Sequence, residues 1–194
     1  MNTVLIKNYG EIPFSEKEIL RYCGVKEASV EIKALMRSCL EELSDIFTYK
    51  ICYIDTELSL CGSVCNFGLF SVNSKSLAKN LSDCGGAIIF AATVGTKIDR
   101  LIAKYSRLSP SRAVMLDAIG TERIEALCNT FCEEISALYT TRPRFSPGYG
   151  DMPIQTQTDI FRLLDASKHV GIFLNESLIM SPSKSVTAII GIKK

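Results

Sequence analysis

The sequence predicts an α+β fold, in which a mixed and largely antiparallel sheet is flanked by helices. Some segments carry apolar residues at helical spacing, and others alternate apolar and polar residues with period two. A short unbroken apolar run at 87–92 indicates a central strand buried on both faces. Helices and strands do not alternate regularly as they do in βαβ units, which favours α+β over a parallel α/β class.

Three helices are predicted in the first half of the chain. Ser15 and Glu18 have the spacing of a capping box, which opens a helix that Gly24 ends. Apolar residues near helical spacing predict a second helix over about 28–47. A short helix is expected at 74–81.

Strands are predicted between and after these helices. Residues 49–60 alternate with period two, as a strand does. Gly62 turns the chain, so that 64–70 can return as an antiparallel partner. Residues 185–192 alternate again and form the last strand.

Three further helices are predicted in the second half. Thr96 suits the N-cap of a helix that follows the 87–92 strand, and this junction is either an anion site or an ordinary connection. The longest helix covers about 109–139 with proline at its first position, and Gly120 inside it indicates a close contact or a bend. The last helix covers about 155–165.

Composition and charge exclude several classes of protein. The chain has 194 residues, of which 47% are hydrophobic and 22% charged, so it has material for a core and too little charge for disorder. Its net charge of +1 lacks the surplus of a general nucleic-acid binder. We see neither an apolar run long enough to cross a membrane nor a leader, and expect one cytoplasmic domain over 1–194.

Eight cysteines are open to two interpretations. They lie mostly in apolar runs, which favours reduced thiols packed as small hydrophobic groups. The pairs Cys61/Cys65 and Cys128/Cys132 are each four residues apart, which a zinc or thiol protein would also allow. We expect no metal and no catalytic residue.

The most informative stretch is Arg144-Phe145-Ser146-Pro147-Gly148-Tyr149. Pro147 and Gly148 suit the centre of a type II turn, which presents backbone groups to a ligand. Arg144 can bind a carboxylate with two hydrogen bonds, and Tyr149 adds a ring and a hydroxyl. The alternative is a rigid surface turn beside a solvated arginine.

This stretch resembles the R-x-x-P-G-Y signature of the activation domain of cobalamin-dependent methionine synthase. Residues 160–164 and 171–182 also resemble that family's following segments, and the N-terminal half is closer to its free-standing relatives. The resemblance implies two regions, the N-terminal helices and hairpin at 1–85 and the core with the signature at 86–194. A cleft over the Pro-Gly bend is required, and an arginine buried against the protein's own carboxylates without such a cleft would contradict the interpretation.

The resemblance implies a reactivation subunit. Such a protein binds S-adenosylmethionine and supplies its methyl group to reduced cobalamin on a separate corrinoid protein, here a methionine synthase or another one. The chain would be a component of that methyltransferase acting in trans, with flavodoxin or a similar reductant as electron donor. Its only histidine, His169, lacks the motif of a cobalamin ligand, so cobalamin would be contacted on the partner.

The family's binding residues carry over to five positions. Arg144 would bind the methionine carboxylate, backbone groups of Ser146 and Gly148 would contact the ligand, and Tyr149 would face the corrin. Glu125 would meet the amino group or the sulfonium, or else is a solvated glutamate beside the apolar stripe.

Two departures from the family favour a second interpretation. An acidic contact in the family's N-terminal part has no counterpart that we can place. An aromatic residue that the family has near its end falls where this chain has Ile189 and Ile190. The alternative function is therefore a docking protein for a corrinoid protein that has lost S-adenosylmethionine binding.

Overall fold

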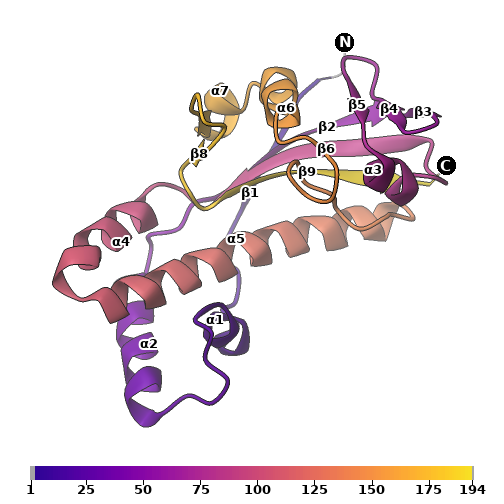
Figure 1. The fold of residues 1–194 in the computed structure, drawn as a ribbon. Coiled ribbons are helices and arrows are strands. Elements are labelled where there is room, and N and C mark those ends of the chain that lie inside the picture. Colours follow the sequence, from indigo (N-terminus) through magenta and orange to yellow (C-terminus); the bar gives the residue numbers. More distant parts are fainter. Residues whose placement is uncertain (1–2, 194) are drawn as a thin grey trace.

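The computed structural model describes residues 3–193 and has a four-stranded antiparallel sheet at its centre (Figure 1). The strands are β1 (Leu5–Tyr9), β2 (Tyr49–Glu57), β6 (Gly86–Thr93) and β9 (Ser185–Ile192), in the order β1-β2-β6-β9. Helices cover both faces of this sheet, so the predicted α+β class is confirmed. Because β2 pairs with β6, residues on both sides of position 85 build the same sheet.

Strand β6 explains why the run at 87–92 is apolar without a break. Every residue of β6 is buried. Its side chains alternate between two cores, with Ile88 and Phe90 in one and Ala87 and Ile89 in the other. A polar residue in a strand covered on both faces needs a hydrogen-bond partner inside the protein, as Thr93 has at the end of β6 in Lys184 O and Ser185 Oγ.

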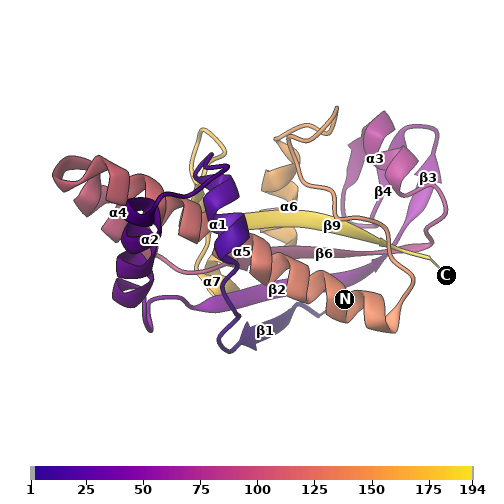
Figure 2. The same ribbon diagram turned by 90° about the horizontal axis from the view of Figure 1, so that it is seen from below.

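The first face of the sheet is covered by four helices: α1 (Glu16–Tyr22), α2 (Val30–Glu42), α4 (Lys97–Leu108) and α5 (Pro110–Leu138). Helix α5 runs along the length of this face, and α1, α2 and α4 gather around its N-terminal half (Figures 1 and 2). The predicted close contact at Gly120 is present, because a Cβ there would lie 3.1 Å from Ile98 Cγ1 and from Lys184.

The second face carries α6 (Thr156–Leu164) and α7 (Ala166–Val170). A three-stranded meander, β3 (Ser59–Cys61), β4 (Val64–Asn66) and β5 (Ser71–Asn73), lies with α3 (Lys75–Asn80) at one end of the sheet (Figure 1). The turn predicted at Gly62 joins β3 to β4. A small hairpin, β7 (Phe173–Leu174) with β8 (Met180–Ser181), precedes β9.

One predicted helix end is wrong, and the strand predicted over 49–60 is interrupted at Leu58, so that it forms β2 and the start of β3. The second helix ends at Glu42 and not near residue 47, because Leu43 caps it and Asp45 takes a left-handed φ of 60°. Thr96 is the N-cap residue of α4, as predicted, but its side chain makes no capping hydrogen bond. In the first turn of α4, Asp99 instead accepts bonds from the backbone N–H and the hydroxyl of Ser183.

All eight cysteines are free thiols, and four of them are fully buried: Cys39, Cys52, Cys65 and Cys128. Within residues 3–193 no three His, Cys, Asp or Glu side chains are grouped as metal ligands would be. No helix of the described chain is long and apolar enough to span a bilayer.

Candidate functional site

The Pro-Gly stretch forms a tight turn at the edge of the sheet. Tyr149 N donates to Ser146 O at 3.1 Å, and Gly148 has a φ of +84°. This positive φ is what position three of a type II turn requires. Tyr149 is 70% exposed, and its ring meets the ring of Phe145 edge to face at 5.4 Å.

Backbone hydrogen bonds fix the start of this loop to the outer side of β9. Phe145 N donates to Ile189 O at 2.8 Å, and Ile189 N donates back to Phe145 O at 2.9 Å. Arg142 N donates to Gly191 O at 2.9 Å. The signature therefore begins as an irregular addition to the sheet, which gives Arg144 a defined position.

Arg144 points back to α5. Its Nη2 donates to Glu125 Oε2, and its Nη1 donates to Asn129 Oδ1 at 2.7 Å. The Arg144 side chain is 23% exposed and that of Glu125 is 36% exposed. The half-buried cation also lies beside Cys132, whose pKa is raised by burial and lowered in part by Arg144. Sequence analysis selected Arg144 and Glu125 separately, and the structure brings them into direct contact.

A groove lies next to this ion pair, on the side of α5 that faces α1. Its volume is about 410 Å³, within the range of about 300–1,000 Å³ that small-molecule sites occupy. Glu125 and Asn129, the two partners of Arg144, line it, and so do Glu18, Glu122 and Glu133. Arg21 is the arginine in its lining. The groove is lined by more acidic than basic side chains, but Glu18, Glu122 and Glu125 each pair with an arginine, which offsets most of the negative charge.

The turn residues lie apart from this groove. None of Arg144, Ser146, Gly148 and Tyr149 lines any of three prominent hollows in the described residues. The cleft that the interpretation requires over the bend is not among these hollows, and Arg144 is bonded to Glu125, so both observations count against that interpretation. The groove adjoins the glutamate side of the Arg144 pair instead.

A fully buried ion pair on α5 was missed by the sequence analysis. The Arg123 side chain is 0% exposed, and it donates to both oxygens of Glu122, each at 2.6 Å. Its remaining donors go to the backbone oxygens of Ile12 and Pro13. Arg123 therefore fixes the segment around Ile12 and Pro13. These two residues line the acidic groove, and their neighbours Glu11 and Phe14 line a second hollow.

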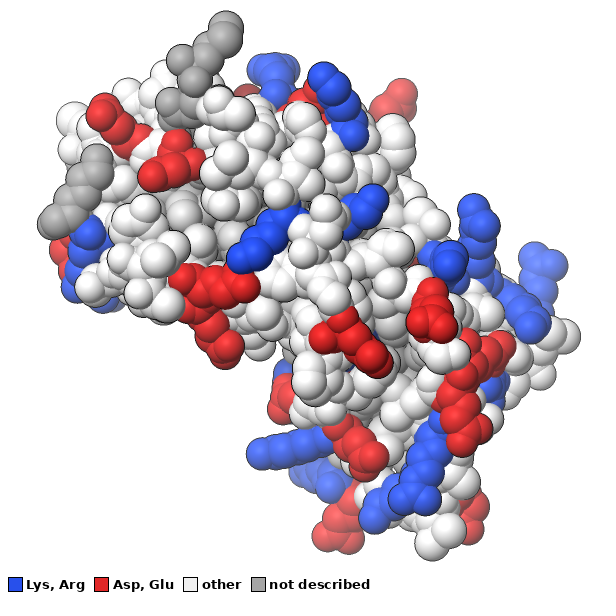
Figure 3. Space-filling model, turned by 180° about the vertical axis from the view of Figure 1, so that it is seen from behind, with Lys and Arg blue, Asp and Glu red and all other residues white. Residues whose placement is uncertain are grey.

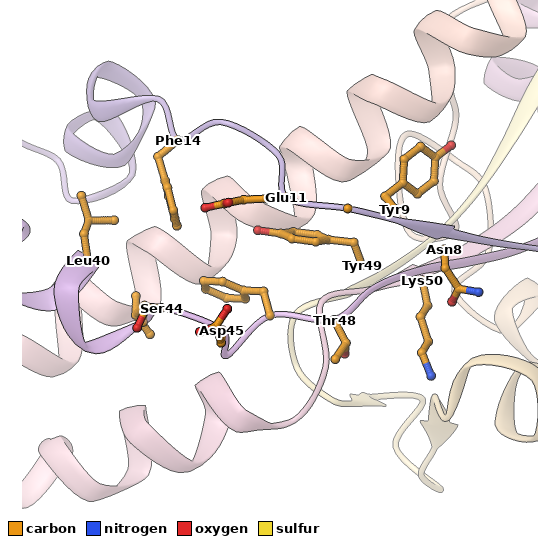
Figure 4. Close-up of a pocket in the computed structure, with 13 residues that line it drawn as sticks. Asn8, Tyr9, Glu11, Phe14, Leu40, Ser44, Asp45, Thr48, Tyr49 and Lys50 are labelled. Atoms are coloured by element: carbon orange, nitrogen blue, oxygen red, sulfur yellow. The ribbon is translucent and has the colours of Figure 1, made fainter.

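That second hollow lies at the opposite edge of the sheet, between the end of β1 and the start of β2 (Figure 4). Its volume is about 480 Å³. Phe14, Tyr49 and Glu11 border it, and none of the five predicted site residues does.

Charges of both signs are interspersed on the face opposite to that of Figure 1, with wide uncharged areas between them (Figure 3). This agrees with the net charge of +1 and shows no continuous basic surface on that face.

Comparison with known families addresses the resemblance. Residues 131–194 match the family model described as vitamin B12 dependent methionine synthase, activation domain. The predicted resemblance is confirmed. The region matched to the activation domain contains Arg144, the Pro-Gly turn and β9. It begins at residue 131 and therefore does not include Glu125.

The whole chain also has the fold of a solved structure, "Crystal Structure of the MetH Reactivation Domain bound to AdoHcy". The TM-score is 0.70 over 98% of this chain and 78% of the other, at 17% sequence identity. The activation-domain fold therefore extends beyond the region that the family model matches. No curated protein sequence matches the chain.

Proposed function

We propose that this chain binds S-adenosylmethionine and supports reductive methylation of cobalamin on a separate cobalamin-dependent methionine synthase. The observation that carries the proposal is the match of residues 131–194, which include the signature turn, to the activation-domain family model. The solved domain of the same fold that is described as bound to AdoHcy supports it, as does the contact between Arg144 and Glu125 beside the acidic groove.

An arginine and a glutamate side by side are complementary to the zwitterionic end of an amino acid. The guanidinium has five N–H donors, and Arg144 Nε has no bonded partner within the described chain. The same holds for Glu125 Oε1. Arg144 would bind the ligand carboxylate, and Glu125 would accept from the ligand ammonium.

Backbone groups of the turn would complete the contact. The N–H of Gly148 already donates to Met152 O at 3.0 Å, and Ser146 O accepts from Tyr149. The Ser146 N–H and the Gly148 carbonyl are therefore the groups that the turn offers to a ligand. The exposed Tyr149 ring would cover the corrin side of the ligand.

The chemistry asks little of this chain beyond positioning. Cobalamin on the partner supplies a strongly nucleophilic reduced cobalt, and the sulfonium carries a methyl group ready for transfer. This chain would hold the sulfonium in line and exclude water, without an acid–base pair. A one-electron reductant such as flavodoxin and a cytoplasmic location, where thiols stay reduced, belong to the same proposal.

A docking protein without ligand binding is the second candidate function. It is favoured by the turn residues, which line none of the described hollows, and by the bonds that already hold Arg144 to Glu125 and Asn129. Such a protein would hold a corrinoid partner in its reducible conformation.

Calorimetric titration with S-adenosylmethionine separates the two functions. We expect wild type to bind and Arg144→Ala to lose about 30-fold or more in affinity, since a charged hydrogen-bonded partner is removed. Arg162→Ala is the matched control, because Arg162 is a highly exposed arginine that pairs with Asp159 on α6. No heat with folded wild type would overturn the proposal and support the docking protein.

A further inference from the structure

The signature loop is attached at both ends to one short segment of the N-terminal half. We propose that residues 74–83, here called the α3 segment, are the positioning element that sets the shape of the S-adenosylmethionine-binding turn. The inference rests on the proposed function, and it adds residues outside the 131–194 region of the family match.

Asp151 makes the attachment that follows the turn. Its carboxylate accepts from Ser74 Oγ at 2.5 Å, from Lys75 N at 2.9 Å and from Ser76 N at 3.0 Å. These bonds hold the pKa of Asp151 well below its ordinary range, with the Ser74 hydroxyl as the largest cause. The carboxylate is therefore ionised at neutral pH, when hydrogen bonds to it are strongest.

Arg142 makes the attachment that precedes the turn. Its Nε and Nη2 donate to the two oxygens of Asp83, at 2.7 Å and 2.6 Å. Lys193 also lies within ion-pair distance of the same carboxylate, at 2.5 Å. The Arg142 bond lowers the pKa of Asp83 more than any other contact does.

The α3 segment is itself immobilised by the core. Leu77 and Leu81 are fully buried in the second core, and Ser74 Oγ accepts from Leu77 N at 3.0 Å. The turn also touches the segment between its two attachments, since a Cβ on Gly150 would lie 3.0 Å from Ser76 Oγ. The positive φ of Gly150, +58°, adds a second reason for glycine there.

Two attachments on one rigid segment leave the intervening residues little freedom. Only five residues, 146–150, separate Phe145, which is bonded to β9, from Asp151. Release of Asp151 would remove the side-chain attachment that follows the turn and leave Met152, buried in the second core, as the next anchor on that side. The Ser146 and Gly148 backbone groups would then sample orientations that do not fit the ligand, and affinity would fall while the fold stays intact.

The test compares Asp151→Asn with a matched control. Asp99 accepts from the backbone N–H and the hydroxyl of Ser183 at 2.8 Å and 2.7 Å, which are bonds of the same kind, one fewer in number, on another part of the chain. We expect Asp151→Asn to weaken S-adenosylmethionine binding about tenfold and Asp99→Asn to leave it within about twofold. Ser74→Ala added to Asp151→Asn should change affinity little further, because both remove the same attachment.

A second readout is independent of the ligand. Hydrogen exchange of the amides at 146–150 should become faster in Asp151→Asn and stay unchanged in Asp99→Asn. Equal affinity of Asp151→Asn and wild type would overturn the inference while leaving the proposed function in place. Should wild type itself not bind, the proposed function fails, and unchanged exchange in Asp151→Asn would still overturn the positioning role.

Should Asp151→Asn not fold, Asp83→Asn is tested by the same titration and hydrogen-exchange measurements. It releases the Arg142 attachment at a carboxylate whose side chain is 39% exposed. Faster exchange at 146–150 and weaker binding support the inference, and wild-type values for both contradict it.

Discussion

Two arginines that pair with glutamates of α5 show how the same ion pair can serve different ends. Arg123 and Glu122 are 0% and 4% exposed, whereas Arg144 and Glu125 are 23% and 36% exposed. All the donor nitrogens of Arg123 are bonded within the protein, and its guanidinium lies 3.9 Å from the ring centroid of Phe14. Arg144 retains an unbonded Nε. The closed pair holds the chain together, and the open pair is available to a ligand.

The largest effect is expected from Arg123→Ala. It leaves Glu122 buried without its cation, so the free energy of unfolding should fall by about 3–5 kcal/mol. Urea unfolding measures the loss, with Arg162→Ala as a surface control expected within about 0.5 kcal/mol of wild type. A loss below about 1 kcal/mol would show that the closed pair is not structural.

Replacing the two glutamates should separate stability from binding. Glu122→Gln should mainly lower the free energy of unfolding, and Glu125→Gln should mainly weaken ligand binding. Glu122→Gln should lower the free energy of unfolding by about 1–3 kcal/mol, because a buried bond to a charged group is lost. Glu125→Gln should cost less than about 1 kcal/mol but weaken S-adenosylmethionine binding. Unfolding and titration of both variants provide the comparison, and equal effects of the two on both quantities would abolish the distinction.

A smaller change in stability is expected for Arg144→Ala. A partly exposed pair contributes up to about 1 kcal/mol, so thermal unfolding should shift by only a few degrees. A loss as large as that of Arg123→Ala would mean that Arg144 is also a structural clamp.

The smallest expected effect is that of alkaline pH on the difference in unfolding free energy between Arg123→Ala and Arg144→Ala. Alkaline pH is expected to act mainly through buried thiols. Burial raises the pKa of Cys52 to about 12 and that of Cys65 to about 11. Their folded-state pKa values lie above the unfolded value of about 8.5, so the stability they contribute is complete below pH 8.5 and is lost as pH rises toward 11–12. Each thiol should cost less than about 1 kcal/mol at pH 9.

Both arginines stay charged over this range. The difference in unfolding free energy between Arg123→Ala and Arg144→Ala should therefore be the same at pH 7 and pH 9, while both variants lose stability. Urea midpoints at the two pH values measure it. Cys65→Ala should show a shallower alkaline loss, and an unchanged slope there would rule out that thiol as a cause.

Local patterns in the sequence predicted most elements of the fold. The β6 run, the proline at the start of α5 and the Ser15 capping box each depend on neighbours in the chain, and each is confirmed. The end of α2 was not predictable in this way. Ile46 still packs against the core from an irregular segment, so its apolar character extended the helical pattern beyond Glu42.

The candidate site was predictable only in part. Pro147 and Gly148 indicate a turn because proline and glycine each restrict the backbone, and Arg144 stood beside them. The attachment of Asp151 to Ser74 joins residues 77 positions apart, and no spacing rule reveals it. The burial of Arg123 likewise depends on a segment more than a hundred residues earlier.

The pairing of Phe145 with Ile189 also determines when the site can exist during synthesis. Ribosomes deliver the chain from its N-terminus, and β9 is the last strand to emerge. Until β9 lies beside β6, the backbone of Phe145 lacks its partner Ile189, and the loop is held by the α3 segment alone. A nascent chain stalled before residue 185 would therefore hold the turn without its attachment to the sheet, so full ligand affinity should appear only when β9 docks.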